Sequence, residues 1–337
     1  MNNNNKIAIS EINNGDVKSA VFEALNSIDA GNLFKRHGMK ILIKPNLLAP
    51  KKPEKAVTTH PAVLRAVIHW LKQFNPKRII VADSSGTYLK GITDLAFEVS
   101  GIRNVCEEEH IEFIPFERTK CKSYKVESPL ILNEFPASRL LEECDIIINI
   151  PKIKTHINTK LTCSIKNMFG TLILELKSKT HKMFPNNLDF NCAIVDIYSV
   201  SQPQLTIIDG FYCQEGNGPS MGDVVKLDLI LAGFDPVALD TTVCKIIDFN
   251  PEDIQHIYMV VVRYESGDSF GRSYGNWKIV GVYKNVEDAQ EILDKINYDE
   301  KHRYDEDYKK EYEKEFRDWD GYFERFENVD IEVLHVL

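Results

Sequence analysis

Short apolar runs alternate with amphipathic segments along most of the chain. Runs rich in β-branched residues predict strands, and stretches with apolar residues every three or four positions predict helices. The predicted strands cover residues 6–12, 39–46, 77–86, 145–152 and 205–211, and the clearest predicted helices cover 16–29 and 60–74. Continuous apolar strands are typical of a sheet that helices cover on both faces. The pattern predicts an α/β fold with a mixed, mostly parallel β-sheet flanked by helices.

Polar or charged residues stand where four of these strands are predicted to stop. The four endings are Lys44-Pro45-Asn46, Asp83-Ser84-Ser85-Gly86, Lys152 with Lys154, Thr155 and His156, and Asp209-Gly210. In open α/β sheets, ligands bind beyond the carboxyl ends of the strands. Four such endings together indicate a shared ligand cleft at that edge.

Residues 298–337 differ from the rest of the chain. Aromatic residues recur every four positions from Tyr304 to Phe316, which is typical of one face of a helix, and residues 329–336 alternate like an edge strand. We therefore expect an α/β domain over residues 1–297 and an acidic, aromatic-rich extension with a helical segment over 298–337. The interpretation we favour packs that helix on its own domain. The alternative is a helix that docks a protein partner.

Charge is distributed unevenly along the chain. Residues 298–337 hold 14 acidic and 7 basic residues, which accounts for −7 of the formal net charge of −9. Against the nearly neutral remainder, residues 150–182 carry seven Lys, two His and one acid, Glu175. This concentration predicts a local anion site. The acidity of the chain as a whole argues against nucleic acid as a partner.

The composition also bears on the cellular location of the protein and on the cofactors that it could bind. No apolar run approaches the roughly 20 residues that span a bilayer, and the first ten residues lack the apolar core of a signal peptide. Cytoplasmic location without a membrane partner is the expectation. The seven cysteines form no C-x-x-C pair. We therefore expect reduced, mostly buried thiols and no iron–sulfur cluster. The sequence does not indicate another cofactor.

The residue types at the predicted strand ends suggest separate roles in ligand binding and in catalysis. Lys44 and Lys152, with Lys154, would bind carboxylate or phosphate groups of a ligand. A structural alternative is that carboxylates of the protein neutralise these lysines in a buried ion-pair network.

Four other residues are candidates for catalysis. His156 or His60 would act as general acid or base, because histidine titrates near neutral pH. Asp83 or Asp209 would orient a histidine or bind a cation. His60 lies at a predicted helix start, so structural capping is its alternative role. No metal-ligand spacing such as H-E-x-x-H occurs, and no metal site is predicted.

Several phrases, taken together and in this order, resemble the family called domain of unknown function 362. They are ILIKPNLL with TTHPAVLRAVIHWLK, then IIVADSSG, DIIINIPKIKTHINTKLTCSIKNMFG, LTIIDGFYCQEGNGPSMGD and LAGFDPVALDTTVCKIIDFNPEDI. The resemblance covers roughly residues 38–283 and implies a mixed α/β domain. It adds Asp235 and Asp240 as pattern positions. With the strand-end residues, it implies an anion- or ligand-binding set of Lys44, Asn46, Thr59, Lys152, Lys154, Thr155, Lys166, Asn167, Glu215 and Gly218.

Many members of that family carry ferredoxin-type cysteine motifs, which implies redox chemistry. This chain departs from the pattern because it lacks such a cysteine run. The leading hypothesis is an enzyme that binds an anionic small molecule or cofactor at the carboxyl edge of the sheet and transfers electrons or protons. The alternative is a non-catalytic module that binds a ligand or a partner.

Overall fold

A computed structural model describes residues 6–249, except 88, 158 and 174, together with the backbone of three strands at 257–267, 273–283 and 329–336. The chain divides into two compact units, residues 1–255 and 256–337. This division differs from the predicted one at 297/298, because the strand at 329–336 pairs with the strand at 257–267.

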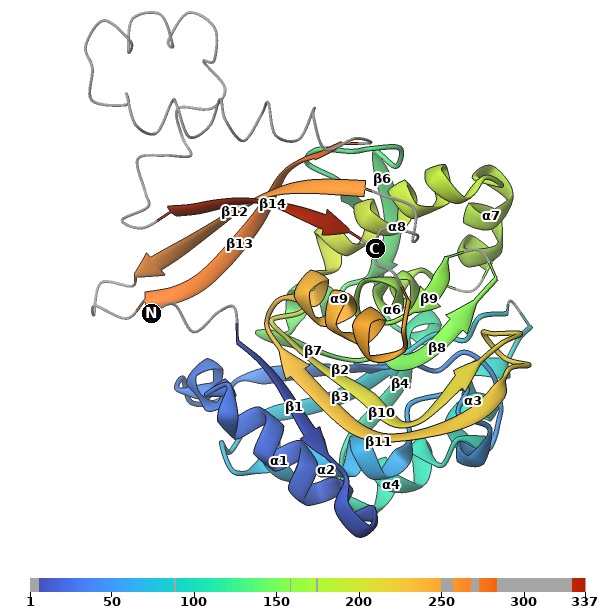
Figure 1. Ribbon diagram of the computed structural model, residues 1–337, viewed down its shortest axis with the longest axis vertical. Helices are drawn as coiled ribbons and strands as arrows, with labels where there is room; N and C mark the ends of the chain where they lie inside the picture. Colours follow the sequence, from blue (N-terminus) through green and yellow to red (C-terminus); the bar gives the residue numbers. More distant parts are fainter. Residues whose placement is uncertain are drawn as a thin grey trace, which may run out of the picture. The chain divides into compact units, whose positions relative to one another are not determined.

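A nine-stranded mixed sheet forms the centre of the first unit (Figure 1). Its strands are β1 (Ile7–Glu11), β2 (Lys40–Pro45), β3 (Arg78–Asp83), β4 (Glu112–Pro115), β7 (Ile146–Ile150), β8 (Lys152–His156), β9 (Lys160–Thr162), β10 (Leu205–Glu215) and β11 (Asp223–Gly233). The main order is β1-β11-β10-β7-β2-β3-β4, and β8 pairs with both β10 and β9. Strands β10, β7, β2, β3 and β4 pair in parallel. The predicted α/β fold with a mostly parallel sheet is confirmed.

Helices cover both faces of this sheet. They are α1 (Val17–Ser27), α2 (Pro61–Lys72), α3 (Ile92–Val99), α4 (Ile102–Glu108), α5 (Leu140–Glu143), α6 (Ser164–Asn167), α7 (Glu175–Met183), α8 (Asn187–Ser201) and α9 (Pro236–Ile246). Helices α1, α2 and α4 lie on one face, and α6, α8 and α9 lie on the other (Figure 1). A separate two-stranded sheet pairs β5 (Cys121–Lys125) with β6 (Glu134–Ser138).

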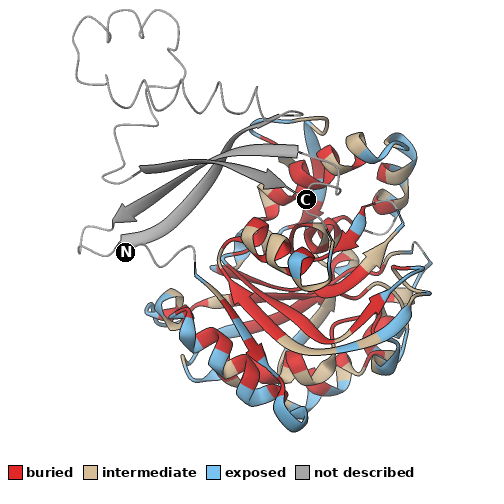
Figure 2. Cartoon of the chain, viewed as in Figure 1, coloured by how far each residue is buried: buried red, intermediate tan, exposed pale blue. Residues whose placement is uncertain are grey.

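The main apolar core lies between the sheet and the layer of α1 and α2 (Figure 2). The inward side chains of α2 recur with helical spacing and include Val63, Val67 and Leu71, all 0% exposed. They belong to the same cluster as Ile41 and Ile43 of β2. Each such side chain contributes about 1.5–3 kcal/mol on burial, so this layer fixes the sheet and hence the positions of its strand ends.

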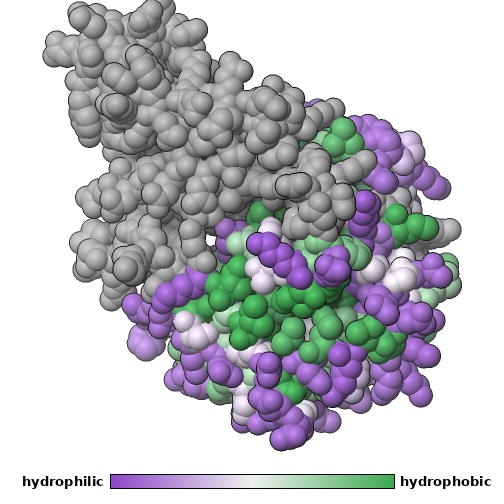
Figure 3. Space-filling view, viewed as in Figure 1, coloured by the Kyte–Doolittle hydropathy of each residue, from purple (hydrophilic) through white to green (hydrophobic). Residues whose placement is uncertain are grey.

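Strand β11 is exposed or only partly buried over its first seven residues and buried over its last four. Figure 3 shows apolar residues gathered over the middle of the described surface, where β11 runs, with hydrophilic residues around them. On β11, Val224 is 42% exposed.

Two predicted strand endings are wrong. The strand predicted over 145–152 is two strands, because Pro151 has no N–H for the ladder and the chain changes partner there. After Pro151 the chain continues as β8, which pairs with β10. Likewise β10 continues beyond Asp209-Gly210 to Glu215, with a register shift between Gly210 and Tyr212. Lys152 and Asp209 are therefore paired residues inside the sheet rather than strand-end loops.

The described part of the second unit is a three-stranded antiparallel sheet. It consists of β12 (Ile257–Gly267), β13 (Ser273–Tyr283) and β14 (Val329–Val336), in the order β13-β12-β14. The edge strand predicted at 329–336 is confirmed. The aromatic helix predicted in the extension lies outside the described residues.

Candidate functional site

Two lysine–aspartate pairs are buried in the sheet, one at the carboxyl ends of β2 and β3 and one between β8 and β10. Lys44 Nζ lies 3.0 Å from Asp83 Oδ1, and Lys152 Nζ lies 2.8 Å from Asp209 Oδ2. All four side chains are 3% exposed or less. Removal from water costs several kcal/mol per ion, and each pair offsets that cost by mutual attraction. In this structure carboxylates of the protein therefore neutralise Lys44 and Lys152, which is the structural alternative considered from the sequence.

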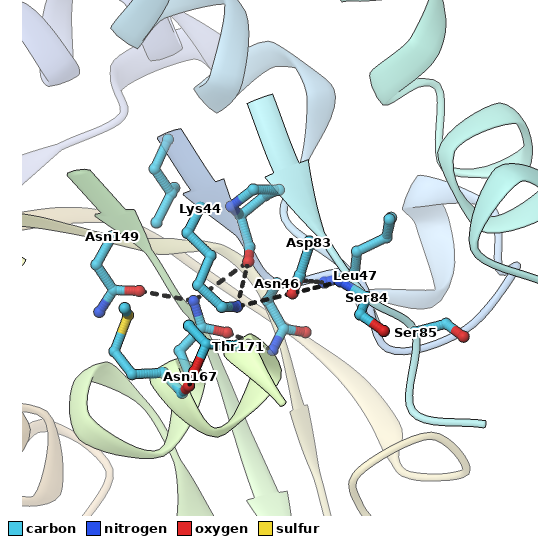
Figure 4. Close-up of polar contacts among 12 residues, drawn as sticks. Lys44, Asn46, Leu47, Asp83, Ser84, Ser85, Asn149, Asn167 and Thr171 are labelled. Atoms are coloured by element: carbon cyan, nitrogen blue, oxygen red, sulfur yellow. Dashed lines mark hydrogen bonds and ion pairs between the residues drawn. The ribbon is translucent and has the colours of Figure 1, made fainter. Parts of the chain in front are cut away.

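Backbone N–H groups also donate to both carboxylates. Asp83 accepts from the N–H of Leu47 at 2.9 Å (Figure 4). Asp209 accepts from the N–H of His60 at 2.6 Å and from the N–H of Phe211 at 3.1 Å. Asp209 therefore holds the backbone of His60 rather than its ring.

A third lysine of this edge has no carboxylate partner among the described residues. Lys154 is 1% exposed, and its Nζ donates to Asn46 Oδ1 at 2.8 Å and to the carbonyl oxygen of Val57 at 2.7 Å. Burial and the charge of Lys166 hold the pKa of Lys154 well below its usual range. Neutral acceptors thus stabilise this ammonium group without cancelling its charge.

Lys177 of α7 adds a fourth buried amine. Its Nζ donates to the carbonyl oxygens of Ser84 and Ser85, the latter at 3.0 Å. Burial lowers the pKa of Lys177 to about 8, and the attraction of Asp83 opposes this shift.

Lys166 of α6 is the least compensated of these groups. Its Nζ lies 5.1 Å from the ring centroid of Phe169 and 5.5 Å from that of Phe190. Among the described residues it has no hydrogen bond or ion pair. Burial, with the charge of Lys177, lowers the pKa of Lys166 to about 7. Aromatic faces stabilise an ammonium ion by only about 0.5–2 kcal/mol, so these rings offset only part of the cost of burying the Lys166 charge.

Both predicted catalytic histidines are neutral in this environment. Burial and the charges of Lys166 and Lys154 lower the pKa of His156 to about 2. The expected titration of His156 near neutral pH is therefore wrong for this structure, whereas Lys166 does titrate there. Burial also lowers the pKa of His60. His60 caps α2, with its Nδ1 accepting from the N–H of Ala62 at 3.2 Å.

A chain of side-chain amides joins Asn46, the partner of Lys154, to Asn167 of α6 (Figure 4). Asn46 donates to Asn167 Oδ1 at 2.8 Å, and Asn167 donates to Asn149 Oδ1 at 2.7 Å. Asn149 donates to the carbonyl oxygen of Ser164 at 2.9 Å. The chain joins the ends of β2 and β7 to the helix that carries Lys166.

Two further contacts fix this edge. Thr59 Oγ1 donates to the carbonyl oxygen of Ile150 at 2.7 Å and accepts from the N–H of Asn46 at 2.7 Å. Gly170 packs directly on the first ion pair, since a Cβ there would lie 2.5 Å from Lys44 Nζ and 2.8 Å from Asp83 Oδ1.

A cavity of about 500 Å³ opens at the end of β8, where Thr155 and His156 follow Lys154 along the strand. It is lined by Thr155, His156, Ile157, Lys160, Gly216, Asn217, Gly218, Met221, Asp248 and Phe249. The loop between β10 and β11 forms one wall, where Thr155 Oγ1 donates to the carbonyl oxygen of Gly216 at 3.0 Å. A Cβ at Gly218 would lie 1.9 Å from the carbonyl oxygen of Thr155, so only glycine allows this approach.

The predicted residues fall into three groups. One set surrounds the buried lysines: Lys44, Asn46, Thr59, Asp83, Lys152, Lys154, Lys166, Asn167 and Asp209. A second set lines the cavity: Thr155, His156 and Gly218. Glu215 lies exposed at the end of β10, and the ring of His60 contacts Phe211 and Tyr212. The N–H of Gly218 already donates to the carbonyl oxygen of Gly216 at 2.8 Å and is not directed at an anion.

Asp235 and Asp240 both accept from backbone N–H groups. Asp235 caps α9, with Oδ1 accepting from Val237 at 2.9 Å. Asp240 accepts from Ser164 at 2.7 Å and Ile165 at 3.1 Å, at the start of α6. Their contacts position helices rather than a ligand.

Sequence reasoning missed several residues of the site, namely Asn149, Phe169, Gly170, Lys177, His181 and Phe190. The ring of His181 stacks on Phe190 with centroids 4.1 Å apart, and the charge of Lys166, after burial, lowers its pKa to about 4. The basic run over 150–182 contained a signal for Lys177 and His181, but nothing in it distinguished them from exposed lysines and histidines.

Comparison with known proteins decides the family. The family described as Domain of unknown function (DUF362) matches residues 41–245. The chain belongs to the DUF362 family. The matched segment contains both ion pairs and all of the buried lysines described above.

Individual relatives are more distant. The thylakoid-associated protein sll1697 of Synechocystis sp. is 26% identical over 241 residues, which cover 71% of this chain and 73% of that protein. Two solved structures also match. One is a Thermotoga maritima protein, with 15% identity, a TM-score of 0.44, and coverage of 69% of this chain and 58% of the other. The second is the lactate racemase apoprotein of Thermoanaerobacterium thermosaccharolyticum, with 12% identity, a TM-score of 0.46, and coverage of 71% and 56%.

The described part of the chain also bears on metals, thiols and membranes. It contains no group of three or more His, Cys, Asp or Glu side chains placed to hold a metal ion. All seven cysteines lie within the described residues, and five of them are buried. No described helix is both long and apolar enough to cross a bilayer. Cytoplasmic location and the absence of an iron–sulfur cluster stay predictions.

The contrast between Lys152 and Lys154 predicts different effects on stability. Lys152→Met should lower the free energy of unfolding by about 3–5 kcal/mol, because it leaves the Asp209 carboxylate buried and unpaired. Lys154→Met removes a buried ammonium together with its hydrogen bonds, so the change should be below about 2 kcal/mol. Urea unfolding of both variants measures the difference. Equal losses would mean that Lys154 is as fully compensated as Lys152.

Lys166 should make stability depend on pH. Its folded pKa of about 7 lies below the unfolded value, so its charged form costs stability fully below pH 7 and this cost fades as pH rises. Lys166→Met should therefore stabilise the protein most below pH 7. Above pH 7, the gain in free energy of unfolding of this variant over the unmodified protein should shrink by up to about 1.4 kcal/mol per pH unit. The test is urea unfolding from pH 6 to pH 9.5. Lys179→Met, at an exposed pair with Glu175, should show no such trend.

Proposed function

We propose that this protein binds an anionic small molecule at the carboxyl edge of its sheet and that Lys166 exchanges a proton with it. One observation carries the proposal: the Lys166 ammonium lies over two aromatic rings without a hydrogen-bond or ion-pair partner among the described residues. A partly buried cation without an acceptor is costly unless a ligand supplies one.

Charge around Lys166 supports an anion rather than a neutral ligand. Lys154 and Lys177 are also buried without an ion pair among the described residues, whereas Lys44 and Lys152 each have one. Three amines in one region thus lack a carboxylate. A carboxylate or phosphate group bound among them would stabilise their charged forms and raise their pKa values.

Proton exchange is assigned to Lys166 rather than to His156. A general acid or base works best when its pKa lies near the operating pH, and the pKa of Lys166 is about 7. Burial and neighbouring cations are known ways to lower a lysine pKa for catalysis. The pKa of His156, about 2, leaves its imidazole neutral, so it would orient a ligand by hydrogen bonding.

The same contacts fit a non-catalytic binding module, the alternative considered from the sequence. The two functions differ in the fate of the bound ligand. A module returns its ligand unchanged, whereas an enzyme that uses Lys166 exchanges a ligand proton with solvent deuterium. Proton NMR of a bound and released carboxylate in D2O separates the two.

Sulfate provides a direct probe, because its charge is constant between pH 6 and 8.5. Its affinity should fall by about tenfold or more over that range as Lys166 loses its proton. Lys166→Met should abolish most of this pH dependence and weaken binding at pH 6. Isothermal titration calorimetry at constant ionic strength measures both effects.

Lys179→Met is the matched control, since Lys179 lies exposed on α7 and pairs with Glu175. This variant should bind sulfate like the unmodified chain. If Lys166→Met binds sulfate with the original affinity and pH dependence, the site is not at Lys166 and the proposal fails.

A further inference from the structure

We infer that the anion carries an apolar portion, and that the cavity at the end of β8 binds this portion between Ile157 and Met221. The inference rests on the proposed function, because it describes the rest of the ligand whose charged group lies near Lys166. The class of ligand is an amphipathic anion, such as a carboxylate with an alkyl or aryl group.

The apolar wall is the first observation. Ile157 is 84% exposed and Met221 is 81% exposed, the two largest exposed fractions among the large apolar side chains described. Both line the cavity, together with Phe249. Single exposed apolar residues are ordinary, but three that line one concave site form an apolar surface of the kind that binds ligands.

Their positions are fixed by the fold rather than by chance. Ile157 follows β8 directly, and Met221 lies in the loop between β10 and β11. The loop is held on β8 by the hydrogen bond from Thr155 to Gly216 and by the close approach of Gly218. These contacts hold the backbone of the loop that carries Met221 against the end of β8, next to Ile157.

The polar side of the cavity matches the charged end of such a ligand. Thr155 and His156 line it, and His156 lies two residues after Lys154 on β8, so both side chains are on the same face of that strand. Lys160 and Asp248 also line the cavity, as one base and one acid. Net positive charge therefore lies on the lysine side, and apolar surface lies on the side of Ile157 and Met221.

Size agrees with a small amphipathic ligand. The cavity volume of about 500 Å³ falls within the range of about 300–1,000 Å³ typical of small-molecule sites.

The experiment measures affinity for straight-chain carboxylates from acetate to octanoate at constant pH and ionic strength. Burial of one methylene is worth about 0.8 kcal/mol, or about fourfold in affinity, so partial burial should give roughly twofold to fourfold per methylene. In the double variant Ile157→Ser with Met221→Ser, long and short carboxylates should bind almost alike. Leu89→Ser, at a residue 59% exposed that does not line the cavity, should retain the chain-length dependence.

The outcomes separate this inference from the proposed function. If acetate and sulfate bind through Lys166 but affinity does not rise with chain length, the apolar inference is wrong and the anion site stands. If affinity rises with chain length but Lys166→Met changes nothing, the proposed function is wrong. Sedimentation with anionic phospholipid vesicles, without binding of free carboxylates, would assign Ile157 and Met221 to a lipid surface and overturn the inference.

Discussion

The cost of removing lysine ammonium groups from water governs the carboxyl edge of this sheet. Each buried ion loses several kcal/mol of hydration that only close partners offset. Lys44 and Lys152 recover this cost from Asp83 and Asp209, at 3.0 and 2.8 Å. Hydrogen bonds to neutral oxygens offset part of the hydration lost by Lys154. The two aromatic rings beside Lys166 offset the smallest part. Compensation is therefore unequal, and the charge of Lys166 is the one that the proposed anion would neutralise.

The surrounding fold serves this arrangement. The parallel strands place Lys44, Asp83 and Asn149 at one edge, and the amide chain joins that edge to α6. Gly170 lets the chain pass directly over the ion pair of Lys44, where any side chain would collide with it. These contacts, with those of Asn149 and Asp240 to the start of α6, fix the backbone of the helix that carries Lys166. Preorganised charge of this kind is how binding sites gain affinity without reorganisation when the ligand arrives.

Much of the fold could be predicted from the sequence, because the spacing of apolar residues within a segment indicates whether that segment is a helix or a strand. The apolar runs at β2, β3, β7 and β10 were recognisable, as were helix starts at Asp16 and His60. The strand at 329–336 was recognisable for the same reason. The change of partner at Pro151 was not, since which strand pairs with which depends on the packed sheet.

The site was predictable only in part. Residue types at strand ends identified Lys44, Lys152 and Lys154, but not which of them would meet a carboxylate. Burial reverses the expectation for His156, since a titration near neutral pH assumes a solvated ring. Lys177 and His181 lie on α7, and no spacing in the sequence predicts that this helix packs beside the buried lysines. Pairing and desolvation are properties of the folded chain rather than of any motif.

The protonation of the Lys166 amine offers the most direct test of an anion site at this edge. Two-dimensional NMR of protein labelled with 13C at lysine Cε, with Lys166→Arg to assign the signal, gives its pKa with and without sulfate. We expect a pKa of about 7 in the free protein and a higher value when sulfate is bound. A value near 10.5 that sulfate does not change would show a solvated, uninvolved lysine and contradict the assignment of the site to Lys166.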